Sequence, residues 1–223
     1  MHHTGLGAAR MIGLELGSGP LDVVCLGAHP DDVEIGCGGT LLRLAERDDV
    51  TVRAVLLTGT EDRLGEARAA LDSFVPGSKV DCAGLPDGRL PAVWGEVKEY
   101  LEQVAEHVRP DVVLAPRVDD AHQDHRLVGR LASTVWRDSL VLHYEIPKWD
   151  GDLSAPTHYV GFDEATARRK VELLHAGYPS QTGRDWWDDE LFLGLMRVRG
   201  VECRSRYAEG FYASKVLIDP SVG

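Results

Sequence analysis

A histidine and two aspartates stand together near the start of the chain, in the segment Ala-His-Pro-Asp-Asp at residues 28–32. His29 and Asp32 are three residues apart, and imidazole nitrogen and carboxylate oxygen are both good ligands for zinc. Asp31 lies between them and is the right kind of group for acid–base work beside a metal. A catalytic zinc site uses three protein ligands and keeps a fourth position open, so this segment is an incomplete site.

A second cluster, Ala-His-Gln-Asp-His at residues 121–125, can supply the missing ligand. Two histidines and one aspartate around zinc would let a bound water lose a proton near neutral pH. The sequence therefore predicts a metal site built from two segments that the fold must bring together.

Both clusters follow predicted strands. Residues 21–26 are apolar and β-branched enough for a buried strand, and residues 111–115 form another. In open α/β sheets the ligands bind at the carboxyl ends of strands, so we expect both clusters at one edge of a sheet.

Strands and helices alternate along the rest of the chain. Further strands are predicted at residues 50–58, 79–83, 141–144 and 159–162, and a short one near residues 12–16. Helices are predicted at residues 41–47, 62–74, 93–108, 127–135, 165–176 and 189–198. This order predicts an α/β fold of a single domain, Rossmann-like and three-layered, with a mainly parallel sheet and helices on both faces. Residues 1–20 are expected to be an N-terminal lead-in and residues 21–223 the single domain.

The composition narrows the class of protein. Hydrophobic residues make up 43% and charged residues 27%, as in soluble globular proteins, and the net charge of -12 argues against a nucleic-acid partner. The four cysteines show no Cys-x-x-Cys spacing, which favours a reducing cytoplasm over a disulfide framework or zinc ribbon. We expect no signal peptide and no membrane span, because no basic segment precedes an apolar one and no apolar run reaches ~18 residues.

Glycines at positions 36, 38 and 39 leave a second hypothesis open, a nucleotide-binding oxidoreductase or transferase whose glycines cradle phosphate. A dinucleotide fingerprint needs Gly-x-Gly-x-x-Gly directly after the strand, and His-Pro-Asp-Asp stands there instead. We therefore expect the glycines to allow close helix packing. A third hypothesis is an inactive metal-binding module, against which the intact Asp31 and His122 argue.

Residues 28–32 and 36–40, followed far downstream by residues 122–125, resemble the zinc-dependent de-N-acetylases of the LmbE/PIG-L family. Residues 58–70, 85–88 and 178–181 resemble further elements of that family, so the resemblance covers residues 21–211. Members remove the acetyl group from N-acetylglucosamine carried on phosphatidylinositol, inositol, malate and antibiotics. The resemblance implies one LmbE-like deacetylase domain that hydrolyses the amide of a small-molecule N-acetylglucosamine-type glycoside, in thiol or secondary-metabolite biosynthesis or a related pathway.

The resemblance also implies which residues hold the metal. His29, Asp32 and His125 would bind zinc, and iron fits the same ligands. Asp31 would be the general base that takes a proton from the attacking water.

Three more residues receive roles from the resemblance. His122, if protonated, would stabilise the developing oxyanion, with Asp124 holding its ring and raising its pKa. Arg63 would face the substrate. Asp120 stands where some relatives carry a tyrosine that helps polarise the carbonyl, so the resemblance does not extend to that contribution.

The sequence leaves the aglycone of the substrate open. Trp186, Trp187 and the irregular segment at residues 148–156 match no motif of the family and are candidates for contact with it. The oligomeric state stays open as well, a homo-oligomer included.

Overall fold

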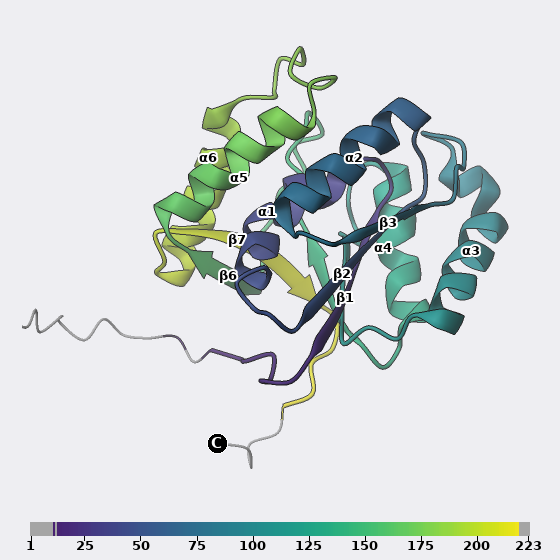
Figure 1. Ribbon diagram of the computed structural model, residues 1–223, viewed down its shortest axis with the longest axis horizontal. Coiled ribbons are helices and arrows are strands. Elements are labelled where there is room, and N and C mark those ends of the chain that lie inside the picture. Colours follow the sequence, from purple (N-terminus) through teal and green to yellow (C-terminus); the bar gives the residue numbers. More distant parts are fainter. Residues whose placement is uncertain (1–10, 12, 219–223) are drawn as a thin grey trace, which may run out of the picture.

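A computed structural model describes residue 11 and residues 13–218 of the chain (Figure 1). Residues 1–10 and 12 of the predicted lead-in lie outside the described part, and residues 11 and 13–20 form neither helix nor strand. The short strand predicted near residues 12–16 is therefore wrong over residues 13–16. The structure is a single α/β domain with a central sheet and helices on both of its faces. The predicted fold class is confirmed.

The bounds of the elements are as follows. The strands are β1 (Leu21–Gly27), β2 (Val50–Leu56), β3 (Lys79–Cys82), β4 (Val112–Pro116), β5 (Leu140–Tyr144), β6 (His158–Phe162) and β7 (Tyr207–Ala213). The helices are α1 (Asp32–Leu44), α2 (Glu61–Phe74), α3 (Trp94–His107), α4 (Gln123–Val135), α5 (Glu164–Gly177) and α6 (Asp189–Cys203), with a 3-10 helix η1 (Leu90–Val93). Across residue 11 and residues 13–218, no helix is long and apolar enough to cross a membrane.

The sheet has the order β3-β2-β1-β4-β5-β7-β6. Strands β1 to β5 pair in parallel, whereas β7 runs antiparallel to both of its neighbours, β5 and β6. The sequence did not predict β7, because the segment Tyr-Ala-Glu-Gly-Phe-Tyr-Ala contains Glu and Gly, which are depleted in strands. The structure stabilises it by pairing on both sides and by burying Glu209 against Lys170.

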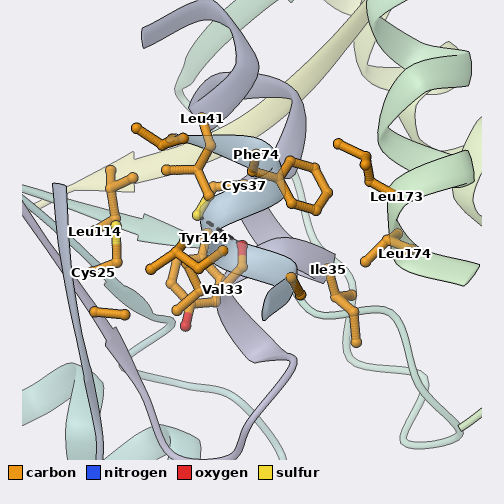
Figure 2. Packing of buried hydrophobic residues seen from close by; sticks show 14 of the residues in the cluster. Cys25, Val33, Ile35, Cys37, Leu41, Phe74, Leu114, Tyr144, Leu173 and Leu174 are labelled. Carbon is orange, nitrogen blue, oxygen red and sulfur yellow. Dashed lines mark hydrogen bonds between the residues drawn. The ribbon is translucent and has the colours of Figure 1, made fainter. Parts of the chain in front are cut away.

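Two hydrophobic cores cover the two faces of the sheet. The larger core lies under α1, α2, α5 and α6, and the smaller one under α3 and α4. In the larger core Tyr144 of β5 lies close to Val33 and Cys37 of α1, while Phe74 of α2 lies toward Leu173 of α5 (Figure 2). Helix α1 is thereby enclosed between the sheet and two other helices.

Helix α1 begins at Asp32, well before the predicted start at residue 41. Its run Gly-Cys-Gly-Gly has poor helix propensity, which hid the first turns from sequence analysis. A Cβ atom on Gly36 would overlap the ring of Tyr144, and one on Gly39 would come within 2.5 Å of the ring of Phe162. The expectation that these glycines allow close packing is confirmed.

Candidate metal centre

The two predicted clusters meet at the carboxyl edge of the sheet. Strands β1 and β4 are parallel neighbours, so the turn after β1 and the segment between β4 and α4 lie side by side. The order of the strands changes direction between β1 and β4, which is where open α/β sheets form a ligand crevice. A pocket of about 620 Å³ opens there and is lined by residues of both clusters.

The donor atoms of His29, Asp32 and His125 converge at the floor of this pocket. His29 Nδ1 lies 3.1 Å from His125 Nε2, which lies 3.2 Å from Asp32 Oδ1. Asp32 Oδ2 lies 3.6 Å from His29 Nδ1. Ligands about 2.0–2.2 Å from a zinc ion have separations of this size, so the donor set fits a divalent cation. His122 also offers a nitrogen, since donor atoms of the three histidines lie within 4.8 Å of one another.

The charges around the donor set favour a positive ion. Burial opposes a charge on His29, but the carboxylates of Asp32 and Asp124 outweigh it and raise the pKa of His29 to about 11. Burial also opposes a charge on His125, whose pKa Asp32 and Asp120 raise to about 9. Burial works against the charge of Asp32, yet His125 and His29 hold its pKa well below its usual range. A cation in this place would meet the same attraction.

Asp31 is held beside the donor set. It is the N-cap residue of α1, yet among the described residues its side chain makes no capping hydrogen bond. Its φ of 142° is a rare conformation for a residue with a side chain, and such strain is typical of functional sites. Asp31 Oδ2 accepts a hydrogen bond from Arg63 Nη2 at 2.7 Å. Burial and then Asp32 raise the pKa of Asp31 to about 6, while Arg63 acts in the opposite direction.

Arg63 lines the pocket, but its guanidinium is largely engaged within the protein. Besides Asp31, it donates from Nη1 to Ser180 Oγ at 2.6 Å and to Glu66 Oε2 at 3.1 Å. The sequence segments 58–70 and 178–181 are thus joined through Arg63 and through Glu66, which accepts from the backbone and hydroxyl of Ser180. The structure places Arg63 as the group that fixes the carboxylate of Asp31.

His122 and Asp124 are close together, but their contact differs from the predicted one. Asp124 Oδ1 accepts a hydrogen bond from the backbone N–H of Leu90 at 3.1 Å, and Oδ2 lies 3.5 Å from His29 Nε2. His122 Nδ1 accepts from the backbone N–H of Asp124 at 3.3 Å. Burial, followed by the charges of His125 and His29, lowers the pKa of His122. The predicted contact in which the Asp124 carboxylate holds the His122 ring is wrong, because this carboxylate faces His29. The charge of Asp124 does act to raise the pKa of His122, but burial and the two histidines outweigh it.

Sequence analysis missed the residue that holds the ring of His125. Asp120 Oδ1 accepts a hydrogen bond from His125 Nδ1 at 3.2 Å, and it also lies 2.9 Å from Lys148 Nζ. A carboxylate behind a metal-ligating histidine fixes its tautomer and orientation. In the sequence Asp120 is notable only because some relatives have tyrosine at that position. No motif or spacing in the sequence predicts its contact with Lys148.

Some of the residues predicted to contact the aglycone line the pocket, and one is buried in the core. Trp186 lines the pocket together with Trp149, and their ring centroids are 5.8 Å apart. Trp187 is buried in the larger core against Phe192 and Tyr178, so the expectation that it contacts the aglycone is wrong. The segment 148–156 contributes Lys148, Trp149 and Asp150 to the pocket.

Comparison with known proteins agrees with this architecture. The family described as PIG-L: GlcNAc-PI de-N-acetylase matches residues 24–136. The protein described as uncharacterized deacetylase YaiS of Escherichia coli (strain K12) is 31% identical over 137 residues, which are 56% of this chain and 74% of that protein. The diacetylchitobiose deacetylase of Thermococcus kodakarensis is 32% identical over 127 residues, 49% of this chain and 46% of the relative, so this chain spans under half of that protein.

The solved structures include a similar fold over nearly the whole chain. The conserved protein TT1542 from Thermus thermophilus has a TM-score of 0.69 and 25% identity, covering 91% of this chain and 99% of its own. The matched family segment runs from β1 to the end of α4 and so contains both halves of the candidate metal centre. From the family match and the relative in Escherichia coli together, this chain belongs to the PIG-L (GlcNAc-PI de-N-acetylase) family.

Proposed function

We propose that this protein is a metal-dependent hydrolase that removes the acetyl group, or a similar small acyl group, from the 2-amino position of an N-acetylglucosamine-type glycoside. The observation that carries the proposal is the convergence of His29, Asp32 and His125 beside the buried carboxylate of Asp31. The family and the diacetylchitobiose deacetylase among its relatives support the same class of reaction.

His29, Asp32 and His125 would hold the metal, zinc or iron, and would leave a coordination position toward the pocket. When bound, such an ion polarises a carbonyl oxygen and lowers the pKa of water. Asp120 and Asp124 would orient this set, since one faces the outer nitrogen of His125 and the other that of His29.

Asp31 is proposed to act as the general base. A water molecule attacks the amide carbon, and Asp31 accepts the proton that the water loses. The C–N bond then breaks, and the proton passes from Asp31 to the leaving amine, which gives a free 2-amino group and a carboxylic acid. The hydrogen bond from Arg63 keeps the carboxylate of Asp31 in one orientation during both transfers.

His122 is proposed to stabilise the oxyanion as a neutral donor. Its Nδ1 accepts a hydrogen bond from the backbone of Asp124, so the ring proton is placed on Nε2. The lowered pKa of His122 is consistent with this neutral form. In comparable oxyanion holes, a hydrogen-bond donor that is oriented before the charge develops lowers the activation free energy by about 2.7–4 kcal/mol.

The pocket has room for more than the reacting group. Trp149 and Trp186 also line it, and their rings would offer apolar faces to a sugar or aglycone beyond the amide. We propose a small-molecule glycoside as the substrate.

The direct test is a mass-spectrometric screen of the zinc-loaded protein on N-acetylglucosamine conjugates with different aglycones. We expect a loss of acetyl from at least one conjugate, a free amine in the product, and loss of turnover when a chelator removes the metal. A zinc-loaded protein that releases no acid from any N-acylated glucosaminide in a broad panel would contradict the proposal.

A further inference from the structure

His29 has carboxylates on both sides of its ring. Its Nδ1 faces Asp32 and His125, as described above, while its Nε2 lies 3.0 Å from Asp87 Oδ1 and 3.5 Å from Asp124 Oδ2. His29, Asp87 and Asp124 each offer one donor atom, and these atoms lie within 4.8 Å of one another. The outer nitrogen of the imidazole is therefore the centre of a second set of metal-ligating groups.

The carboxylate of Asp124 has an unused oxygen in this set. Asp124 is 0% exposed, and its Oδ1 accepts from the backbone of Leu90. Its Oδ2 has no hydrogen-bond partner within the described part of the chain, although it is aimed at His29 Nε2. A buried carboxylate oxygen that accepts no hydrogen bond is costly, and its neighbour His29 Nε2, at 3.5 Å, lies beyond the usual hydrogen-bond distance.

A single proton cannot satisfy both carboxylates. One N–H at His29 Nε2 can donate a good hydrogen bond to Asp87 or to Asp124, and the other carboxylate is then left with its negative charge. Counting residue 11 and residues 13–218, neither carboxylate forms an ion pair with a lysine or arginine within 4.0 Å. A divalent cation would satisfy both oxygens at once, and two carboxylates with one imidazole are ligands that suit zinc.

We propose that the protein has a second divalent-cation site, formed by Nε2 of His29, Oδ1 of Asp87 and Oδ2 of Asp124. The two cation sites share the His29 ring, one at each nitrogen, and the proton of Nε2 passes to solvent when the second ion binds. The site is open on one side, because the side chain of Asp87 is 75% exposed and lines the pocket. This inference goes beyond the proposed deacetylation, and its test needs no substrate.

The test compares the zinc stoichiometry of three full-length proteins by calorimetric titration of the metal-free chain, with metal analysis of the saturated protein. The variant is Asp87→Ala, whose exposed side chain can be removed without a cavity. The matched control is Asp150→Ala, another carboxylate of the same pocket that lies outside the second set. Far-UV circular dichroism confirms that each variant is folded.

We expect the unaltered protein and Asp150→Ala to bind the same number of zinc ions, and Asp87→Ala to bind one fewer while keeping the tighter site. Equal stoichiometry in all three proteins would overturn the proposal, since Asp87 and Asp124 would then act only as hydrogen-bond acceptors for His29. Complete loss of zinc in Asp87→Ala would overturn it too, because Asp87 would then belong to the first site.

Discussion

At the scale of single residues, Asp31, the proposed general base, differs in its surroundings from Asp120, which contacts a proposed metal ligand. Asp31 has a strained backbone, a partner in Arg63 and a pKa raised to about 6 by burial, and then by Asp32. Asp120 has none of these features and contacts His125 and Lys148 instead. Substitutions of Asp31 and Asp120 are therefore expected to have different effects, the first on turnover and the second on zinc affinity.

Replacing Asp31 by Asn removes the base and keeps the size of the side chain. We expect turnover to fall by about 10²–10⁴-fold, the range for loss of a general base, with zinc still bound. Steady-state kinetics on the best conjugate of the screen, together with metal analysis, checks both parts. Loss of zinc with Asp31→Asn would show that Asp31 is a ligand and would reverse the proposed roles.

Replacing Asp120 by Asn weakens the acceptor that holds the ring of His125. We expect zinc affinity to fall by about 10–100-fold, as for other carboxylates behind a ligating histidine. The matched control is Asp119→Asn in the same segment, because Asp119 is exposed and pairs with Arg117. Competition with a zinc-binding dye measures the affinities, and equal values for the two variants would refute the role of Asp120.

At the scale of elements, α1 is the helix on which the site depends and also the least regular one. Cys37 has non-helical angles, φ −139° and ψ 22°, which divide α1 into two parts. The backbone N–H groups of Gly39 and Thr40 beyond this kink donate to Glu209 of β7, each at 2.7 Å. The second part of α1 is therefore held by a strand from the far end of the chain.

Gly36→Ala tests how closely α1 is packed on the sheet. The added methyl group would overlap the buried Tyr144 ring, so we expect the free energy of unfolding to fall by about 1–3 kcal/mol, the usual cost of overpacking. Gly65→Ala in α2 is the control, since a Cβ there meets nothing within 4 Å among the described atoms. It should raise stability by roughly 0.5–1 kcal/mol through helix propensity. Urea denaturation measures both, and a destabilisation of equal size in the two variants would argue against the packing role.

At the scale of the whole molecule, the stability of the domain should depend on pH through a histidine away from the pocket. His143 of β5 is buried, and its Nδ1 lies 2.9 Å from the carbonyl oxygen of Pro116 in β4. Burial lowers the pKa of His143 below its ordinary value of 6.5. Below about pH 6.5 the unfolded chain therefore binds a proton that the folded chain does not, and the free energy of unfolding falls as the pH falls.

The variant His143→Asn keeps a donor and cannot titrate. We expect the stability difference between the unaltered protein and this variant to shrink as the pH falls from about 6.5 toward the lowered pKa of His143. Urea denaturation at several pH values gives the difference. A gap that stays constant over this range would exclude His143 as the titrating group, and His107→Gln on the surface serves as the control.

The sequence by itself determined the parallel part of the sheet and the two halves of the site. Short apolar runs such as residues 21–26 and 111–115, alternating with helices, are typical of buried strands, and in a parallel sheet the polar clusters at their carboxyl ends share one edge. The tertiary structure alone decided the rest. Helix α1 and strand β7 form against their local propensity because packing and buried hydrogen bonds outweigh it. Whether Asp124 faces His122 or His29 depends on contacts with Leu90 and the turn at Asp87, which no spacing in the sequence records.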